Sequence, residues 1–241
     1  MTKFSRSIEF NVFGRHALFT DPLSKVGGEK CSYHVPTYEA LKGIVKSIYW
    51  KPTLVWIVDE VRVMKRIRTQ TKGTKPQEYG GGNSLAIYTF LADVEYQVRA
   101  HFEWNEHRPE LSADRVEAKH LAIAQRMVER GGRQDIFLGT RDCQGYVEAC
   151  EFGSGTSELD GDGELGFGLM FHGFDYPDET GRHDLYARFW RPRMVNGVIR
   201  FAHPQTCTER KFVRPMTVKS FGSGQTVKLV GEEADELGVS I

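Results

Sequence analysis

The sequence has no apolar run long enough to cross a bilayer. A spanning helix needs about 20 consecutive apolar residues, whereas the longest apolar-rich runs, residues 53–58 and 85–92, have the length of strands. Residues 1–13 also have no apolar stretch and no small-residue cleavage site of the kind that marks a secretory signal. These absences predict a cytoplasmic protein without a membrane role.

Motifs for metals, disulfides and nucleotides are missing as well. The four cysteines include no Cys-x-x-Cys pair, and the eight histidines form no His-x-x-x-His or His-Glu-x-x-His pattern. Asp160, Asp162 and Glu164 alternate with glycines, but the other acidic positions of an EF-hand loop are absent, so a solvated loop is expected there. No phosphate-binding glycine loop and no Gly-x-Ser-x-Gly elbow occurs. We therefore expect neither a metal nor a cofactor.

Charge of one sign does not dominate, since 32 basic and 32 acidic residues cancel in a chain of 241 residues. The two signs are unevenly distributed, with a net charge of +4 over residues 1–150 and −4 over residues 151–241. Residues 62–75 hold six basic residues and no acid, and residues 182–219 hold nine against two acids. Both stretches are candidate phosphate-binding surfaces. The alternative is a solvated strand edge decorated with Lys and Arg.

The pattern of apolar residues in the first half predicts two helices and four strands. Residues 94–104 alternate apolar and polar side chains throughout, which indicates a long strand with one buried face. Pro52 ends the first predicted helix, and Asp114 with Glu117 makes a capping box for the second. The predicted order is strand 7–13, helix 36–50, strand 53–63, strand 94–104, helix 115–130 and strand 144–152. This β-α-β-β-α-β order is typical of a ferredoxin-like or RNA-recognition-motif fold.

Residues 153–241 differ from the first half in composition and in the pattern of their apolar residues. Eight glycines lie between residues 153 and 181, and the remainder alternates short apolar stretches with turns. Asn196-Gly197 predicts a hairpin that joins strand 185–190 to strand 198–202. Residues 231–241 are acidic and are expected to form a loosely held tail. The fold class is thus α+β, with a ferredoxin-like domain over residues 1–152 and a smaller antiparallel β domain over residues 153–241.

Three residues suit cleavage of RNA without a metal. That reaction needs a group to take the 2′-hydroxyl proton, a group to protonate the leaving 5′-oxygen and a cation for the crowded phosphorane. Tyr49 ends the first predicted helix, and Lys119 and His120 lie near the start of the second. Both helices of this fold pack on one face of the sheet, so the three side chains can meet. The alternative is that Tyr49 and His120 are ordinary core residues.

A series of ordered blocks runs through most of residues 8–202, and these blocks are residues 13–14, 17–22, 27–30, 35–43, 48–53, 78–83, 118–120, 133–139, 143–147, 150–155 and 172–181. They closely resemble the type I-C CRISPR-associated Cas5d proteins of the RAMP superfamily. It implies a ferredoxin-like domain followed by a smaller β domain. The catalytic tyrosine, lysine and histidine of the family fall on Tyr49, Lys119 and His120.

The resemblance also implies an activity and partners. Members of the family cut CRISPR repeat precursor RNA at the base of its hairpin without a metal. They then stay on the 5′ handle of the crRNA in a Cascade complex with other type I-C subunits. His120 would move protons because its ordinary pKa lies near 6.5, Lys119 would steady the phosphorane, and Tyr49 would position the 2′-hydroxyl or donate a hydrogen bond.

Two functions of different classes fit the sequence. One is a metal-independent endoribonuclease, and the other is a non-catalytic subunit that binds the 5′ handle of the crRNA, since fold alone does not decide activity. Both require a basic RNA-binding surface, for which the sequence offers Arg62, Lys65, Arg66 and Arg68. Double-stranded DNA is a further candidate partner.

Overall fold

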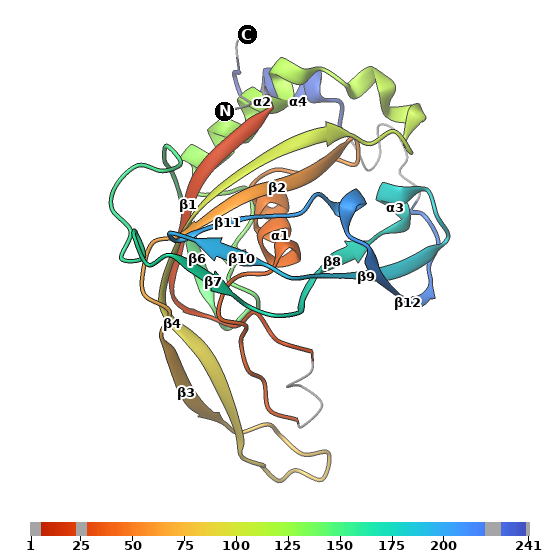
Figure 1. Ribbon diagram of the computed structural model, residues 1–241. Coiled ribbons are helices and arrows are strands. Elements are labelled where there is room, and N and C mark those ends of the chain that lie inside the picture. Colours follow the sequence, from red (N-terminus) through yellow and green to blue (C-terminus); the bar gives the residue numbers. More distant parts are fainter. Residues whose placement is uncertain (1–5, 23–27, 220–227, 240–241) are drawn as a thin grey trace.

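Two antiparallel sheets with helices packed on them form the protein (Figure 1). This computed structural model describes residues 6–22, 28–219 and 228–239. Within these ranges the larger sheet has nine strands and the smaller one has three. The α+β class predicted from the sequence is confirmed.

Four strands of the first half form the middle of the larger sheet. Their order is β6-β1-β4-β2, and every neighbouring pair is antiparallel. One face is apolar because alternate residues such as Phe10, Trp56 and Phe102 are fully buried beneath the helices. The bounds are β1 Ser7–Ala17, β2 Leu54–Val63, β4 Ala86–Trp104 and β6 Gln144–Ala149, with β5 Ile136–Phe137 pairing beyond β6.

Helices α1 (Tyr38–Ile48) and α2 (Glu117–Glu129) lie close to their predicted ranges. The Thr37 side chain caps α1 by accepting a hydrogen bond from the Ala40 amide. Helix α1 contacts β2, whereas α2 contacts β1 and β6. A 3₁₀ helix, η2 (Pro109–Asp114), leads into α2. The end of α1 and the start of α2 are thereby brought together above the sheet.

A strand that the sequence pattern did not predict, β3 (Thr69–Thr74), pairs with the first part of β4. The two project from the body of the protein as an arm (Figure 1). All of β3 is exposed or half-buried, so it has no apolar face that an alternation could reveal. The strand predicted over residues 94–104 is therefore the second part of a longer strand.

The second half is mostly β, as predicted, and contributes to both sheets. Strand β11 (Val198–Arg200) pairs with β2 and continues the larger sheet through β10 (Arg193–Val195) to β7 (Glu164–Gly166). The smaller sheet has the order β12-β9-β8. Its strands are β8 Met170–Asp175, β9 Asp184–Trp190 and β12 Glu209–Pro215, with helix α3 Pro177–Thr180 and 3₁₀ helix η3 Pro204–Thr206 between them.

Two predictions for the second half are corrected. Asn196 and Gly197, both with positive φ, join β10 to β11, so the hairpin does not begin in residues 185–190. Residues 231–241, predicted to be a loose tail, instead hold most of a helix, α4 (Val230–Glu236), whose Val230 and Ala234 are buried, and residues 240–241 lie outside the described ranges. Helix α4 lies beside α2 (Figure 1). The division of the chain at residue 152 stays a prediction. No helix in the described ranges is long and apolar enough to cross a membrane.

Candidate active site

Tyr49 and His120 meet where the end of α1 approaches the first turn of α2. The Tyr49 Oη lies 2.9 Å from His120 Nδ1, and His120 Nε2 lies 2.6 Å from the Asp114 carbonyl oxygen. A carbonyl oxygen only accepts, so Nε2 carries the proton of a neutral imidazole. Nδ1 is then the acceptor for the Tyr49 hydroxyl. This arrangement provides a neutral base that is already hydrogen-bonded to a phenol.

Burial sets the protonation states of this pair, since neither side chain has any exposed surface. Burial raises the pKa of Tyr49, and the carboxylates of Glu233 and Asp114 act in the same direction, so the phenol stays protonated. Burial lowers the pKa of His120, although its contacts with Asp114 act the other way. The site therefore holds a neutral imidazole at neutral pH.

Asp114 is a site residue whose role the sequence did not reveal. The sequence predicted a helix cap, but the residue before α2 is Val116, and no side chain caps the helix there. The fully buried carboxylate instead accepts hydrogen bonds from Thr53 Oγ1 at 2.6 Å and from the Val230 amide. It also lies 3.6 Å from His120 Nε2. Asp114 thereby connects Thr53 beside β2, the imidazole and α4.

Lys119 is half-buried, and its side chain reaches α4. Its Nζ lies 3.4 Å from the place that a Cβ on Gly231 would occupy, so the ammonium is directed at α4. All three residues lie in the described part of the chain, and no hydrogen bond joins Lys119 to either of the other two. The structure therefore brings two of the three predicted catalytic side chains together.

Helix α4 closes this region through Glu233, whose side chain is almost fully buried. The Glu233 carboxylate lies 2.5 Å from Lys51 Nζ and 2.6 Å from Arg133 Nη1. The Lys51 ammonium also donates to the Lys228 carbonyl at 2.6 Å. Lys51 follows the end of α1, and Arg133 follows α2, so α4 spans the ends of both helices.

The four predicted RNA-binding residues differ in how accessible they are. Arg62 is 5% exposed, and its two terminal nitrogens donate to Asp160 and to the carbonyls of Ser154 and Gly155. Lys65 pairs with Asp93 at 2.8 Å and is half-buried. The Arg62 contacts anchor a loop to the sheet, so Arg62 lies beneath the protein surface.

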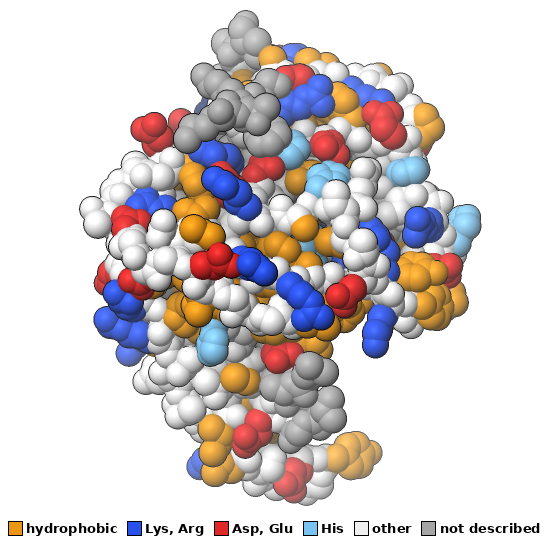
Figure 2. Space-filling view, viewed as in Figure 1, with side chains coloured by type: hydrophobic (Ala, Val, Ile, Leu, Met, Phe, Trp, Pro, Cys, Tyr) orange, Lys and Arg blue, Asp and Glu red, His pale blue; other side chains and the backbone are white. Residues whose placement is uncertain are grey.

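Arg66 and Arg68 are the exposed members of the set. Arg66 pairs with Asp162 at 2.7 Å, so both Asp160 and Asp162 of the glycine-rich loop find arginine partners. On the face of the molecule shown in Figure 2, basic and acidic side chains are interspersed. The exposed positive charge of this set is therefore confined to Arg66 and Arg68, in the connection between β2 and β3.

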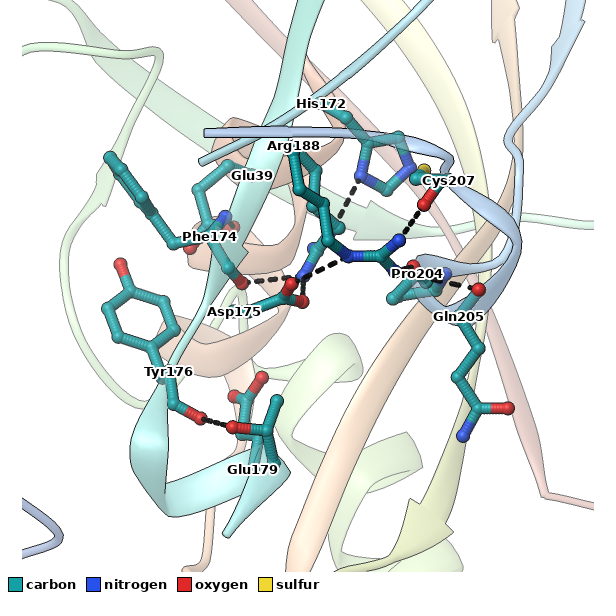
Figure 3. A network of polar contacts seen from close by, with 12 residues as sticks. Glu39, His172, Phe174, Asp175, Tyr176, Glu179, Arg188, Pro204, Gln205 and Cys207 are labelled. Carbon is teal, nitrogen blue, oxygen red and sulfur yellow. Dashed lines mark hydrogen bonds and ion pairs between the residues drawn. The ribbon is translucent and has the colours of Figure 1, made fainter. Parts of the chain in front are cut away.

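A second buried polar cluster lies in the smaller sheet around Arg188, which is 2% exposed (Figure 3). Its guanidinium binds the Asp175 carboxylate, the Phe174 carbonyl at 2.7 Å and His172 Nδ1 at 3.3 Å. Burial, together with the Arg188 charge, lowers the pKa of His172 to about 3. Arg210 also pairs with Asp175. Two arginines of the second basic stretch are thus committed to structural contacts.

Comparison with known families assigns the chain to a class. The family model described as CRISPR-associated protein (Cas5) matches residues 7–202. The chain is therefore a CRISPR-associated protein of the Cas5 group. Within that group it belongs to the Cas5d family.

Curated relatives and solved structures agree with this family. The chain is 27% identical over 221 residues to the CRISPR pre-crRNA endoribonuclease Cas5d of Mannheimia succiniciproducens, covering 80% of this chain and 93% of that protein. It is 28% identical over 196 residues to the protein of the same name from Thermus thermophilus, covering 77% and 80%. A solved CRISPR-associated protein is 38% identical with a TM-score of 0.71, covering 86% of this chain and 97% of that one. A functionally uncharacterized protein from Streptococcus mutans is 37% identical with a TM-score of 0.68, covering the same shares.

Proposed function

We propose that this protein is a metal-independent endoribonuclease that cuts CRISPR repeat precursor RNA at the base of its hairpin and stays on the 5′ handle of the crRNA in a type I-C Cascade complex. The observation that carries the proposal is the hydrogen bond between Tyr49 and the neutral imidazole of His120, in a chain that keeps the lysine of the family trio at position 119. The two curated relatives are named as pre-crRNA endoribonucleases. The cytoplasm is the proposed site of action.

The proposed reaction is a transesterification. The 2′-oxygen attacks the scissile phosphorus, the bond from phosphorus to the 5′-oxygen breaks, and one proton moves from the 2′-hydroxyl to the leaving oxygen through protein groups. His120 takes the proton at Nδ1, where the Tyr49 hydroxyl binds in the free protein. Tyr49 then orients the 2′-hydroxyl, and the Lys119 ammonium stabilises the developing phosphorane charge once it turns from α4 toward the phosphate.

We further infer that residues 1–152 form a ferredoxin-like domain. The strand order β6-β1-β4-β2, with α1 between β1 and β2 and α2 between β4 and β6, supports this inference. In such a fold both crossover helices lie on one face of the sheet. The Tyr49–His120 contact between the two helices is consistent with that placement.

The decisive experiment is incubation of the purified chain with labelled repeat RNA in EDTA. We expect one cut, no cut when the scissile nucleotide carries a 2′-deoxy sugar, and a rate lowered by about 10²–10⁴ in His120→Ala. His34→Ala removes an exposed histidine and is the matched control. Normal cleavage by His120→Ala alongside the control would remove His120 from the mechanism.

For RNA binding we propose the connection between β2 and β3, with Arg66 and Arg68 contacting phosphates and Arg62 and Lys65 holding the underlying structure. Replacing Arg66 and Arg68 with Gln lowers the salt slope of binding by about one unit for each phosphate that is no longer neutralised. Arg193 and Arg200, both mostly exposed, give a control with the same charge change. An unchanged slope in the first variant would place the RNA elsewhere. Double-stranded DNA is a further candidate ligand of this surface.

A non-catalytic subunit that binds the 5′ handle is the second candidate. The complete burial of Tyr49 and His120 favours it, because polar residues of a protein core are typically buried with their hydrogen-bonding groups paired. Tight hairpin binding without any cut in the EDTA experiment would establish this role.

A further inference from the structure

Helix α4 carries four acids in seven residues and lies against the proposed active site. Its one buried acid, Glu233, binds two cations that come from separate elements, Lys51 after α1 and Arg133 after α2. In the described part of the chain, Glu233 is the only carboxylate that pairs with either cation. Lys51 is itself 6% exposed. A buried carboxylate therefore joins two cations that have no other acidic partner among the described residues.

These two cations belong to the surroundings of the Tyr49–His120 pair. The Lys51 charge acts on His120, and the Glu233 and Arg133 charges act on Tyr49. Lys119 Nζ is directed at the same helix beside Gly231. The Val230 amide binds Asp114, whose carbonyl oxygen accepts from His120. Residues 228–236 thus bind Asp114, Lys51 and Arg133 and lie beside Lys119, although the Arg133 side chain stays 51% exposed.

An ammonium and a guanidinium that together bind a carboxylate are also suited to bind a phosphodiester oxygen. The carboxylate and the phosphodiester are both anions that accept charge-assisted hydrogen bonds from Lys and Arg. Tyr49 and His120 have no exposed surface, and α4 binds Asp114 and Lys51 beside them, so we infer that undocking of α4 is the step that opens the pair to RNA. When it leaves, Lys51 and Arg133 lose the anion that neutralises them.

Resting on the proposed function, we propose that Lys51 and Arg133 form an RNA phosphate-binding subsite beside Tyr49 and His120, and that Glu233 of α4 occupies this subsite in the free protein. The RNA backbone and α4 then compete for the same cations. The apparent affinity for RNA is then the affinity of the open form multiplied by the fraction of molecules in which α4 is undocked. The Glu233 carboxylate acts as a built-in competitor of the substrate.

The test compares binding of an uncleavable repeat hairpin, with a 2′-deoxy scissile nucleotide, to full-length variants. Glu233→Gln weakens the docking of α4, and we expect it to bind about tenfold tighter than wild type. Glu232→Gln is the matched control, because Glu232 lies on the same helix but is exposed. Adding Lys51→Gln to Glu233→Gln is expected to abolish the gain and to lower the salt slope by about one.

Each outcome separates this subsite from the proposed function. Equal affinities for Glu233→Gln and Glu232→Gln would overturn the subsite even if wild type cuts RNA. Unchanged affinity on adding Lys51→Gln would show that the cations only hold α4. The expected binding pattern without any cleavage of an all-ribose hairpin would keep the subsite and reject the nuclease. Failure of all variants to bind the hairpin at low salt would reject both.

Discussion

Glu179 connects α3 to α1 through two lysines, and its replacement tests how the halves of the chain are joined. Its carboxylate pairs with Lys42 and, at 2.9 Å, with Lys46. The side chains of Lys42 and Glu179 are 1% and 13% exposed. Burial acts to raise the pKa of Glu179, but the two ammonium groups outweigh it and lower the value to about 2. Glu179→Gln keeps the shape of the side chain and removes the charge.

The expected loss in the free energy of unfolding follows from the pKa of Glu179. Lowering it from 4.5 to about 2 corresponds to roughly 3 kcal/mol of stabilisation when the carboxylate is ionised. Burial lowers the pKa of Lys42 despite the pairing, which offsets part of this gain. We therefore expect Glu179→Gln to lower the free energy of unfolding by about 2 kcal/mol near neutral pH. Because the folded pKa lies below the unfolded one, the stabilisation is present above about pH 4.5 and is lost as the pH falls toward 2.

Urea unfolding of wild type and Glu179→Gln, followed by circular dichroism at several pH values, measures this difference. The two curves should converge as the pH falls from about 5 toward 2. Glu164→Gln is the control, because Glu164 and its partner Arg193 are 53% and 74% exposed, and such a pair contributes less than about 1 kcal/mol. A difference between wild type and Glu179→Gln that stays constant over this pH range would refute the electrostatic account.

Three further predictions concern stability. Burial acts to lower the pKa of His101, but Asp59 at 2.9 Å outweighs it and raises the pKa. The stabilisation from this pair is therefore present below about pH 6.5 and is lost as the pH rises through the raised value. In urea unfolding, Asp59→Asn should lower the free energy of unfolding by about 1 kcal/mol near pH 6 and by less near pH 9. Gly139 has φ +95, and a Cβ there would lie 2.1 Å from the Leu18 carbonyl oxygen, so Gly139→Ala should lower the thermal midpoint by several degrees or prevent folding, whereas Gly43→Ala, with open space, should not. Tyr49→Phe leaves buried His120 Nδ1 without its donor and should cost about 1–3 kcal/mol by urea unfolding; a smaller cost would mean that the hydrogen bond contributes little.

The elements predicted best from the sequence are those that bury one face along their length or that carry their end signals in the local sequence. Strand β1 and the second part of β4 alternate because one face meets the helices and the other does not, and α1 has its cap and its terminating proline within the local sequence. Strand β3 has no buried face, so its pairing leaves no apolar period. Helix α4 was missed because its stabilising partners, Lys51 and Arg133, lie about a hundred residues or more away.

The candidate site was predictable only in part. The two helices that carry Tyr49 and His120 could be placed together from the predicted fold, and the structure adds their hydrogen bond. The accessibility of the basic residues was not predictable from the sequence. Arg62 projects from the face of β2 to which the distant residues 153–160 bind. Asp114 was interpreted from its local spacing, whereas its partners Thr53 and Val230 come from distant parts of the chain.

The pairing of β2 with β11 has a consequence for synthesis on the ribosome. One edge of β2 pairs with β4, and the other pairs with β11, which begins at Val198. A nascent chain that has completed the first half therefore presents an open strand edge until most of the second half has emerged. Open edges favour pairing between chains. Residues 1–152 expressed alone are expected to aggregate, and co-expression of residues 153–241 should reduce that aggregation.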